Sequence, residues 1–166
     1  FQTSYAAARS LDYSLFFLGF MGAAISSRML IAGFVVKRDP LRASCLLSGL
    51  MLGSILLFGF VVDDGLSYVV AAAMLGVGYG LTYSVINGLA ANEAPTGTTA
   101  QSLLLFSLSY FIGVFRFPLL AGKIMVEQGM ANLLLTLIAI ALLNWLITLG
   151  RLIWRHVCST QAMQRV

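Results

Sequence analysis

GFMGAAISSRMLIAGF, residues 19–34, is small or apolar at nearly every position and carries a single arginine, Arg28. Inserting an arginine at the centre of a membrane helix costs about 2.5–3.5 kcal/mol, so this side chain needs compensating contacts. The same contrast extends over the chain, because 60% of its 166 residues are hydrophobic and 10% are charged, against about 25% charged in a soluble domain. With a mean hydropathy of +0.94, the sequence predicts an integral membrane protein.

Five apolar segments are long enough to cross a bilayer, which takes about 20 residues. They predict transmembrane helices over residues 13–36, 41–62, 67–90, 100–126 and 131–154. The connections between them are short, so successive helices should run antiparallel and adjacent in one all-α bundle. We expect residues 1–12, which begin without Met, to be the outer end of a truncated preceding helix and its loop, and residues 155–166 to be a tail.

The distribution of lysine and arginine predicts the orientation of the bundle, because cytoplasmic loops are enriched in both. One side of the predicted bundle carries the basic residues Lys37, Arg38, Arg42, Arg151, Arg155 and Arg165. The other side carries Arg9 and Lys123. The first side is therefore expected to be cytoplasmic, together with the carboxyl-terminal tail.

Two arginines lie deep inside predicted helices. Arg28 is about 12 Å from the inner end of its segment, and Arg116 is about 15 Å from the outer end of its own, at 1.5 Å per residue. All six acidic residues fall at segment ends or in loops. The anion that neutralises these cations must therefore come from a bound solute or from another part of the protein. Alternatively, each guanidinium reaches the headgroups, or bonds backbone carbonyls or buried water, such as the Val114 carbonyl that Pro118 leaves free.

Two stripes of residues follow the predicted helix at 67–90. Small residues recur every four positions, which lets another helix approach closely: Ala72, Gly76, Gly80, Ser84 and Gly88. Beside them lie Tyr79, Tyr83 and Asn87, also four apart. Three hydrogen-bonding side chains on one stripe suit the wall of a polar cavity, although buried tyrosines bonded to a neighbouring helix would explain them as well. In the next helix Ser102, Ser109 and Arg116 form a similar polar stripe.

Signatures of enzymes and metal sites are absent from the sequence. The two cysteines, Cys45 and Cys158, form no CxxC pair, and the single histidine, His156, has no acidic partner nearby. No HExxH, GxSxG or phosphate-binding glycine loop occurs. The net charge of +4 forms no basic stripe suited to nucleic acid. We expect no enzyme activity, no cofactor, no metal and no nucleic-acid partner.

Three segments carry a family resemblance. In GFVVKRDPLR, residues 33–42, Gly33, Arg38 and Arg42 match a loop signature in which Lys37 replaces an aspartate and Pro40 a glycine. The second segment is GVGYGLTYSVINGLAANEAP, residues 76–95, and the third is SLSYFIGVFRFPLLAGKIMVEQG, residues 107–129. In order and spacing they resemble the loop between helices 8 and 9, helix 10 and helix 11 of the major facilitator superfamily.

The resemblance implies one half of a twelve-helix bundle, from the end of helix 7 to helix 12. It implies a secondary transporter in the lipid bilayer of a bacterial inner membrane, with a missing amino-terminal six-helix half and, in some members, a coupling proton. This chain alone should not transport. Arg28 then corresponds to a cavity-facing position on helix 8.

The residues expected to bind solute are Arg28, Arg116, Tyr79, Tyr83, Asn87 and Ser109. Because both deep cations lack an anionic partner, the expected solute is small and anionic. The alternative is a non-transporting membrane subunit, or a truncated remnant of a carrier.

Overall fold

The computed structural model describes residues 2–31, 33 and 39–163, with side chains as far as Arg155, and every described element is a helix. The helices are α1 (Gln2–Ala8), α2 (Tyr13–Leu30), α4 (Pro40–Phe60), α5 (Gly65–Asn92) and α6 (Thr99–Met163). Within this part of the chain, α2, α4, α5 and α6 are long and apolar enough to cross a membrane. The prediction of an all-α fold whose helices are long and apolar enough to cross a membrane is confirmed at this level.

Three of the long helices, α2, α4 and α5, begin at an aspartate cap. Asp12 and Asp39 cap α2 and α4 by accepting bonds from the backbone N–H two residues on, and Pro40 occupies the first turn of α4. Asp64 caps α5 in a reciprocal capping box with Ser67. These aspartates stand in the short connections that the sequence predicted, because a capping carboxylate needs water as well as free backbone N–H groups.

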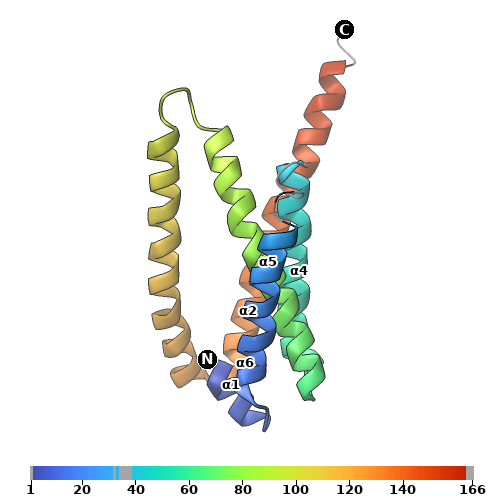
Figure 1. Ribbon diagram of the computed structural model, residues 1–166, viewed down its shortest axis with the longest axis vertical. Coiled ribbons are helices and arrows are strands. Elements are labelled where there is room, and N and C mark those ends of the chain that lie inside the picture. Colours follow the sequence, from blue (N-terminus) through green and yellow to red (C-terminus); the bar gives the residue numbers. More distant parts are fainter. Residues whose placement is uncertain (1, 32, 34–38, 164–166) are drawn as a thin grey trace.

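The last helix, α6, is divided into two arms. Gly129 has φ 85° and ψ 172°, a conformation outside the helical region that favours glycine. Residues 99–128 form the first arm and residues 130–163 the second arm, and Figure 1 shows the two arms diverging from this point. The break lies inside the connection predicted between residues 126 and 131.

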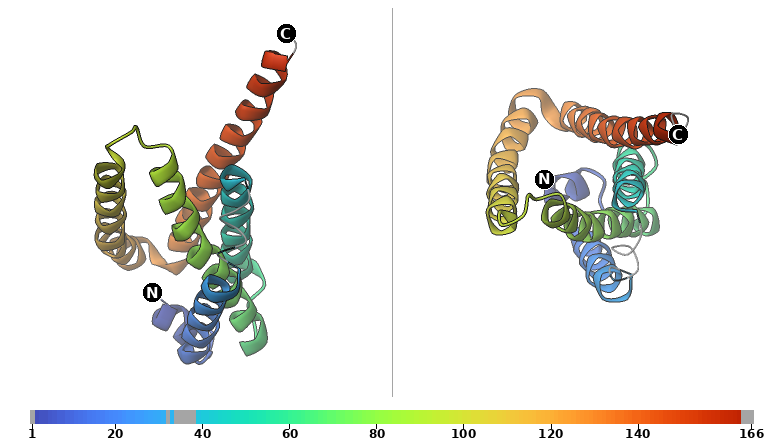
Figure 2. Two further views of the ribbon diagram at one scale, coloured as in Figure 1. Left: turned by 45° about the horizontal axis from the view of Figure 1, so that its top comes forward. Right: turned by 90° about the horizontal axis from the view of Figure 1, so that it is seen from above.

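The helix α5 is the centre of the bundle. Seen from above, it runs between α2 on one side and α4 on the other (Figure 2). The second arm of α6 packs against α4, where Gly49 lies 3.1 Å from the Trp145 ring nitrogen (measured from the position that a Cβ would take) and the Ser48 and Thr148 hydroxyls are 3.0 Å apart. The first arm contacts α5 through Tyr110 and Phe106 and keeps most of its large apolar side chains exposed.

The main core lies at the end of the bundle where α1 packs. Tyr5, Phe16, Phe58 and Tyr68 are buried there, with ring centroids 5.8–6.1 Å apart. The Tyr5 hydroxyl donates to the Phe58 carbonyl. This aromatic cluster packs α1 against α2, α4 and α5 at that end of the bundle.

Ion pairs gather at the two ends of the bundle. At one end Arg155 bonds Asp39, and Arg151 lies 4.0 Å from Glu93. The start of α4 and the late part of α6 therefore share one end, as the distribution of basic residues predicted. At the opposite end Arg9 pairs with Asp63 at 3.8 Å.

Candidate functional site

The helices α2 and α5 meet along a seam of small residues. A Cβ added at Gly76 would overlap the backbone carbonyl of Phe20, and one at Gly80 would lie 3.0 Å from the Ala24 carbonyl oxygen. Ala72 is fully buried on the same stripe. The two backbones are therefore in direct contact, which only small residues permit.

The seam ends before the last two residues of the predicted stripe. Ser84 is half-buried, and no atom lies within 4 Å of a Cβ placed at Gly88. On the other face of α5, Gly78 lies against Met51 and the Leu47 carbonyl of α4. Gly78 was not among the packing residues predicted from the sequence, although it lies among the glycines of GVGYG, residues 76–80.

The side chain of Arg28 crosses this seam. It projects from the last turn of α2, which ends at Leu30 instead of the predicted residue 36. Its Nε donates to the Gly80 carbonyl at 3.0 Å, and its Cζ lies 5.8 Å from the centroid of the Tyr83 ring. Its two terminal nitrogens make no hydrogen bond to any residue that the structure describes. The Nε side of the guanidinium is therefore bonded to α5, and its two terminal nitrogens are available to bind a ligand.

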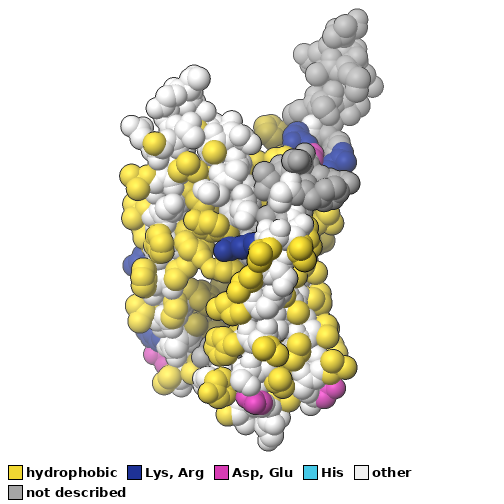
Figure 3. All heavy atoms as spheres, in the orientation of Figure 1, with side chains coloured by type: hydrophobic (Ala, Val, Ile, Leu, Met, Phe, Trp, Pro, Cys, Tyr) yellow, Lys and Arg dark blue, Asp and Glu magenta, His cyan; other side chains and the backbone are white. Residues whose placement is uncertain are grey.

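The position of Gly80 gives the depth of Arg28 in the bundle. The 28 residues of α5 measure about 42 Å, and Gly80 lies about 2 Å from the middle of that length. Figure 3 shows a basic side chain at this level, half-way along the molecule among apolar side chains. Although Arg28 belongs to the last turn of its own helix, its head lies level with the centre of α5.

No carboxylate reaches this level. Among the described residues, which include all six acidic ones, the ion pairs join side chains at the ends of helices. Arg28 takes part in none of them, and neither does Arg116. Over the part of the chain that the structure describes, neither cation therefore forms an ion pair.

Tyr83, whose ring lies beside the Arg28 guanidinium, belongs to a group of three linked tyrosines. The hydroxyls of Tyr79 on α5 and Tyr110 on the first arm of α6 are hydrogen-bonded to each other. The Tyr110 ring packs on Tyr83 with centroids 5.2 Å apart. α2, α5 and the first arm thus meet at one polar cluster, which we call the Arg28 cluster: Arg28, Tyr79, Tyr83 and Tyr110.

The remaining predicted binding residues lie outside the Arg28 cluster. Asn87 is half-buried one turn beyond Tyr83 and makes no hydrogen bond to a described residue. At 3.6 residues per turn, Ser109 and Arg116 point about 100–120° away from Tyr110 on the same helix. Ser109 bonds its own backbone at Leu105, and Arg116 is exposed, without a hydrogen bond, ion pair or ring contact to a described residue.

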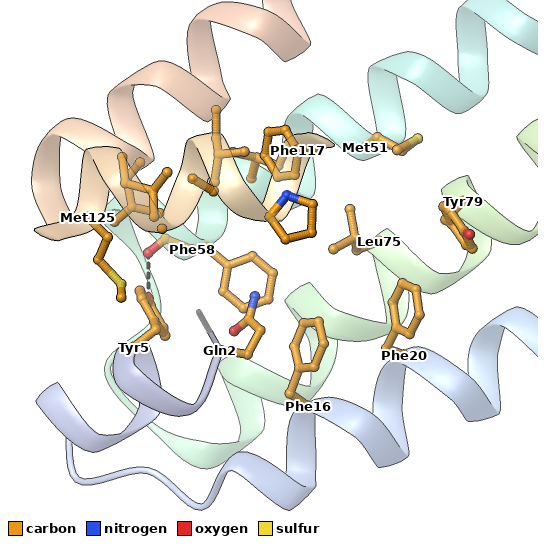
Figure 4. Close-up of a pocket in the computed structure, with 17 residues that line it drawn as sticks. Gln2, Tyr5, Phe16, Phe20, Met51, Phe58, Leu75, Tyr79, Phe117 and Met125 are labelled. Atoms are coloured by element: carbon orange, nitrogen blue, oxygen red, sulfur yellow. Dashed lines mark hydrogen bonds between the residues drawn. The ribbon is translucent and has the colours of Figure 1, made fainter. Parts of the chain in front are cut away.

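A cavity of about 570 Å³ adjoins the cluster. It lies between α1, α2, α4, α5 and both arms of α6, and its wall is almost entirely apolar. Figure 4 shows Phe16 and Phe20 of α2 and Phe117 of α6 pointing into it, with Tyr79 at one end and Tyr5 at the other. Tyr79 therefore belongs both to the wall of the cavity and to the Arg28 cluster.

The predicted loop signature is only partly described. Gly33 is helical with open space around it, and Arg42 pairs with Asp39 at 3.5 Å. Lys37 and Arg38 lie outside the described residues. Within the described chain, no group of histidine, cysteine or acidic side chains could hold a metal ion.

The site thus combines a cation level with the centre of α5, a neighbouring pair of hydrogen-bonded tyrosines and an apolar cavity that Tyr79 lines. Such an arrangement can bind and orient an anionic group without performing covalent chemistry. Comparison with protein-family models, with curated proteins and with solved structures finds no match to this chain.

Proposed function

We propose that this chain is the carboxyl-terminal half of a secondary transporter of the major facilitator type, which moves a small anionic solute by alternating access. One observation carries the proposal. Arg28 reaches the middle of the bundle, has no carboxylate partner among the described residues, and keeps its terminal nitrogens free beside Tyr79 and Tyr110. Charged groups at this depth usually line a solute or ion pathway.

The proposed topology has five crossings. α2, α4 and α5 each cross once, and the two arms of α6 cross in opposite directions on either side of Gly129. The excess of basic residues at the end of the bundle near Asp39 and Arg155 favours a cytoplasmic carboxyl terminus in a bacterial inner membrane. An amino-terminal half of six helices would supply the other wall of the pathway, and a coupling proton would drive it.

Arg28 substitutions in the full-length protein test this function. Reconstituted into liposomes, the protein should exchange small carboxylates or phosphate esters across the membrane. Arg28→Ala and Arg28→Lys should both reduce exchange by about tenfold or more, since lysine cannot reproduce the fixed fork of donors. Lys123→Gln is the matched control, because Lys123 lies at the end of the bundle, paired with Glu127 at 3.8 Å.

Normal exchange by Arg28→Ala would contradict the site assignment. A folded wild-type protein that exchanges none of these anions would instead favour a non-transporting membrane subunit.

A further inference from the structure

We infer that the solute is an amphipathic anion, whose acidic group binds between Arg28 and the Tyr79–Tyr110 pair and whose apolar body fills the adjoining cavity. The inference rests on the proposed function and narrows its solute class. It also assigns Tyr110, which the sequence analysis did not identify, as a binding residue for the acidic group.

The cavity determines which part of a solute it accepts. Its volume of about 570 Å³ falls within the usual range for ligand pockets, about 300–1,000 Å³. The polar side chains at its α1 end already have partners, since the Tyr5 hydroxyl donates to the Phe58 carbonyl and the Gln2 amide oxygen accepts from Tyr68. The rest of the wall is phenylalanine, leucine, methionine and similar side chains. An apolar body suits this space, and a free small ion does not.

The hydroxyl pair supplies donors at the other end of the cavity. Two tyrosine hydroxyls carry two protons, and their mutual bond uses one of them. The second proton has no acceptor among the described residues. An anionic oxygen placed beside Tyr79 and Tyr110 would accept it, which a neutral apolar solute could not do.

Arg28 supplies the charge. A guanidinium has five N–H donors, and only the Nε–H of Arg28 is bonded to a described residue, at the Gly80 carbonyl. The four remaining donors form the planar edge that binds carboxylate or phosphate oxygens in pairs. Tyr79 lies in both the cluster and the cavity wall, so we place the acidic group at the Tyr79 end of the cavity and the apolar body inside it.

Binding of dodecanoate, hexanoate and dodecanol to the full-length protein in phosphatidylcholine nanodiscs tests the inference. The wild type should bind dodecanoate more tightly than either of the others, because only dodecanoate has both the charge and the long chain. Arg28→Gln and Tyr110→Phe should each weaken dodecanoate binding about tenfold and leave dodecanol unchanged, since each removes a bond to a charged group.

A matched glycine pair tests the apolar half of the site. Gly122 lines the cavity and Gly113 does not, yet both lie on the first arm with no atom within 4 Å of an added Cβ. Gly122→Leu should fill part of the cavity and weaken dodecanoate binding about tenfold, with hexanoate unaffected. Gly113→Leu should change neither affinity.

Two sources could supply such an anion, a membrane lipid or a water-soluble acid. Adding phosphatidylglycerol to the nanodiscs separates them. Weaker dodecanoate binding by the wild type, but not by Gly122→Leu, would show that the lipid occupies the same site. Unchanged binding would identify a soluble acid as the occupant.

The inference is overturned if Arg28→Gln binds dodecanoate as the wild type does, or if the two glycine variants behave alike. These failures are distinguishable from failure of the proposed function. If Arg28→Ala abolished exchange of small anions while Gly122→Leu left dodecanoate binding intact, the transporter would stand and the amphipathic class would be wrong.

Discussion

At the scale of single residues, the contacts of Arg28 are strong enough to hold it in the membrane. A hydrogen bond from a charged donor contributes about 1.5–3 kcal/mol, and a cation over an aromatic ring about 0.5–2 kcal/mol. Its position in the last turn of α2 adds about 0.3–1 kcal/mol from the helix dipole. Together these offset an insertion cost of about 2.5–3.5 kcal/mol. These contacts therefore stabilise Arg28 at this depth without a ligand, and the N–H groups of its terminal nitrogens remain available to bind one.

Gly76 provides a residue-scale prediction. Gly76→Ala should lower the free energy of unfolding by about 1–3 kcal/mol, because the new Cβ would overlap the Phe20 backbone and separate α2 from α5. Gly88→Ala is the control on the same helix and in the same four-residue register, with open space around it. That variant should be neutral or more stable by up to about 1 kcal/mol. Denaturant titration in detergent micelles measures both, and equal losses would contradict the close α2–α5 contact.

At the scale of helices, carboxylate caps mark the starts of α2, α4 and α5. The Asp64 carboxylate accepts bonds from the Ser67 hydroxyl and backbone N–H, and these bonds hold the pKa of Asp64 below its usual value. The pKa of Asp12 is likewise lowered, by hydrogen bonds from the backbone N–H and the hydroxyl of Ser14. Each cap satisfies N–H groups that would otherwise be free at the membrane surface.

The Asp64 cap should make the stability of the protein depend on pH. Folding lowers the pKa of Asp64. Its contribution to the free energy of unfolding is therefore complete at pH values above the unfolded-state pKa of about 3.9, and it is lost as the pH falls through the lower folded-state pKa. Asp64→Ala should lower the Tm by a few degrees at neutral pH, and the difference from wild type should shrink at pH values below about 4. Asp63→Ala removes the same charge from the same loop without removing the cap. A Tm loss from Asp63→Ala equal to that from Asp64→Ala would argue against the cap.

Sequence patterns predicted the helix starts better than the helix pairing. Asp39 and Asp64 bond backbone N–H groups two and three residues on, so a helix start depends on local sequence, and the predicted starts of the long helices lie within two residues of the observed ones. The end of α2 at Leu30 was not predicted, because apolar residues continue beyond it. Which helix lies beside Tyr110 was not predicted either, since that depends on the register between α5 and the first arm of α6. Such a register is set by the packing of the whole bundle.

At the scale of the whole molecule, α5 organises the site. It contacts α2 along the seam through Gly76 and Gly80, and it contacts α4 through Gly78. The first arm of α6 closes the remaining side through Tyr110 and Phe106, both packed on Tyr83. Because the chain turns sharply at Gly129, one helix contributes walls on two sides of the cavity.

The candidate site was predictable in part for a physical reason. Polarity within an apolar helix indicates that a residue avoids lipid, and it directed attention to Arg28, Tyr79 and Tyr83, which lie close together in the structure. Polarity does not show which neighbour a residue faces. Arg116 and Ser109 are polar in the same way, yet they point away from Tyr110, and their role in binding stays a prediction.

The central claim is that Arg28 faces a watery solute pathway instead of lipid. The most direct test is the rate at which a water-soluble methanethiosulfonate reagent labels cysteine introduced at that position, after Cys45→Ala and Cys158→Ala remove the native thiols. Leu143→Cys is the control, because Leu143 lies near the middle of the predicted last span and 60% of its side chain is exposed on the bundle surface. Thiols react as thiolates, which form in water and not in lipid. We expect Arg28→Cys to be labelled more than about tenfold faster than Leu143→Cys, and equal, slow labelling at both positions would contradict the account.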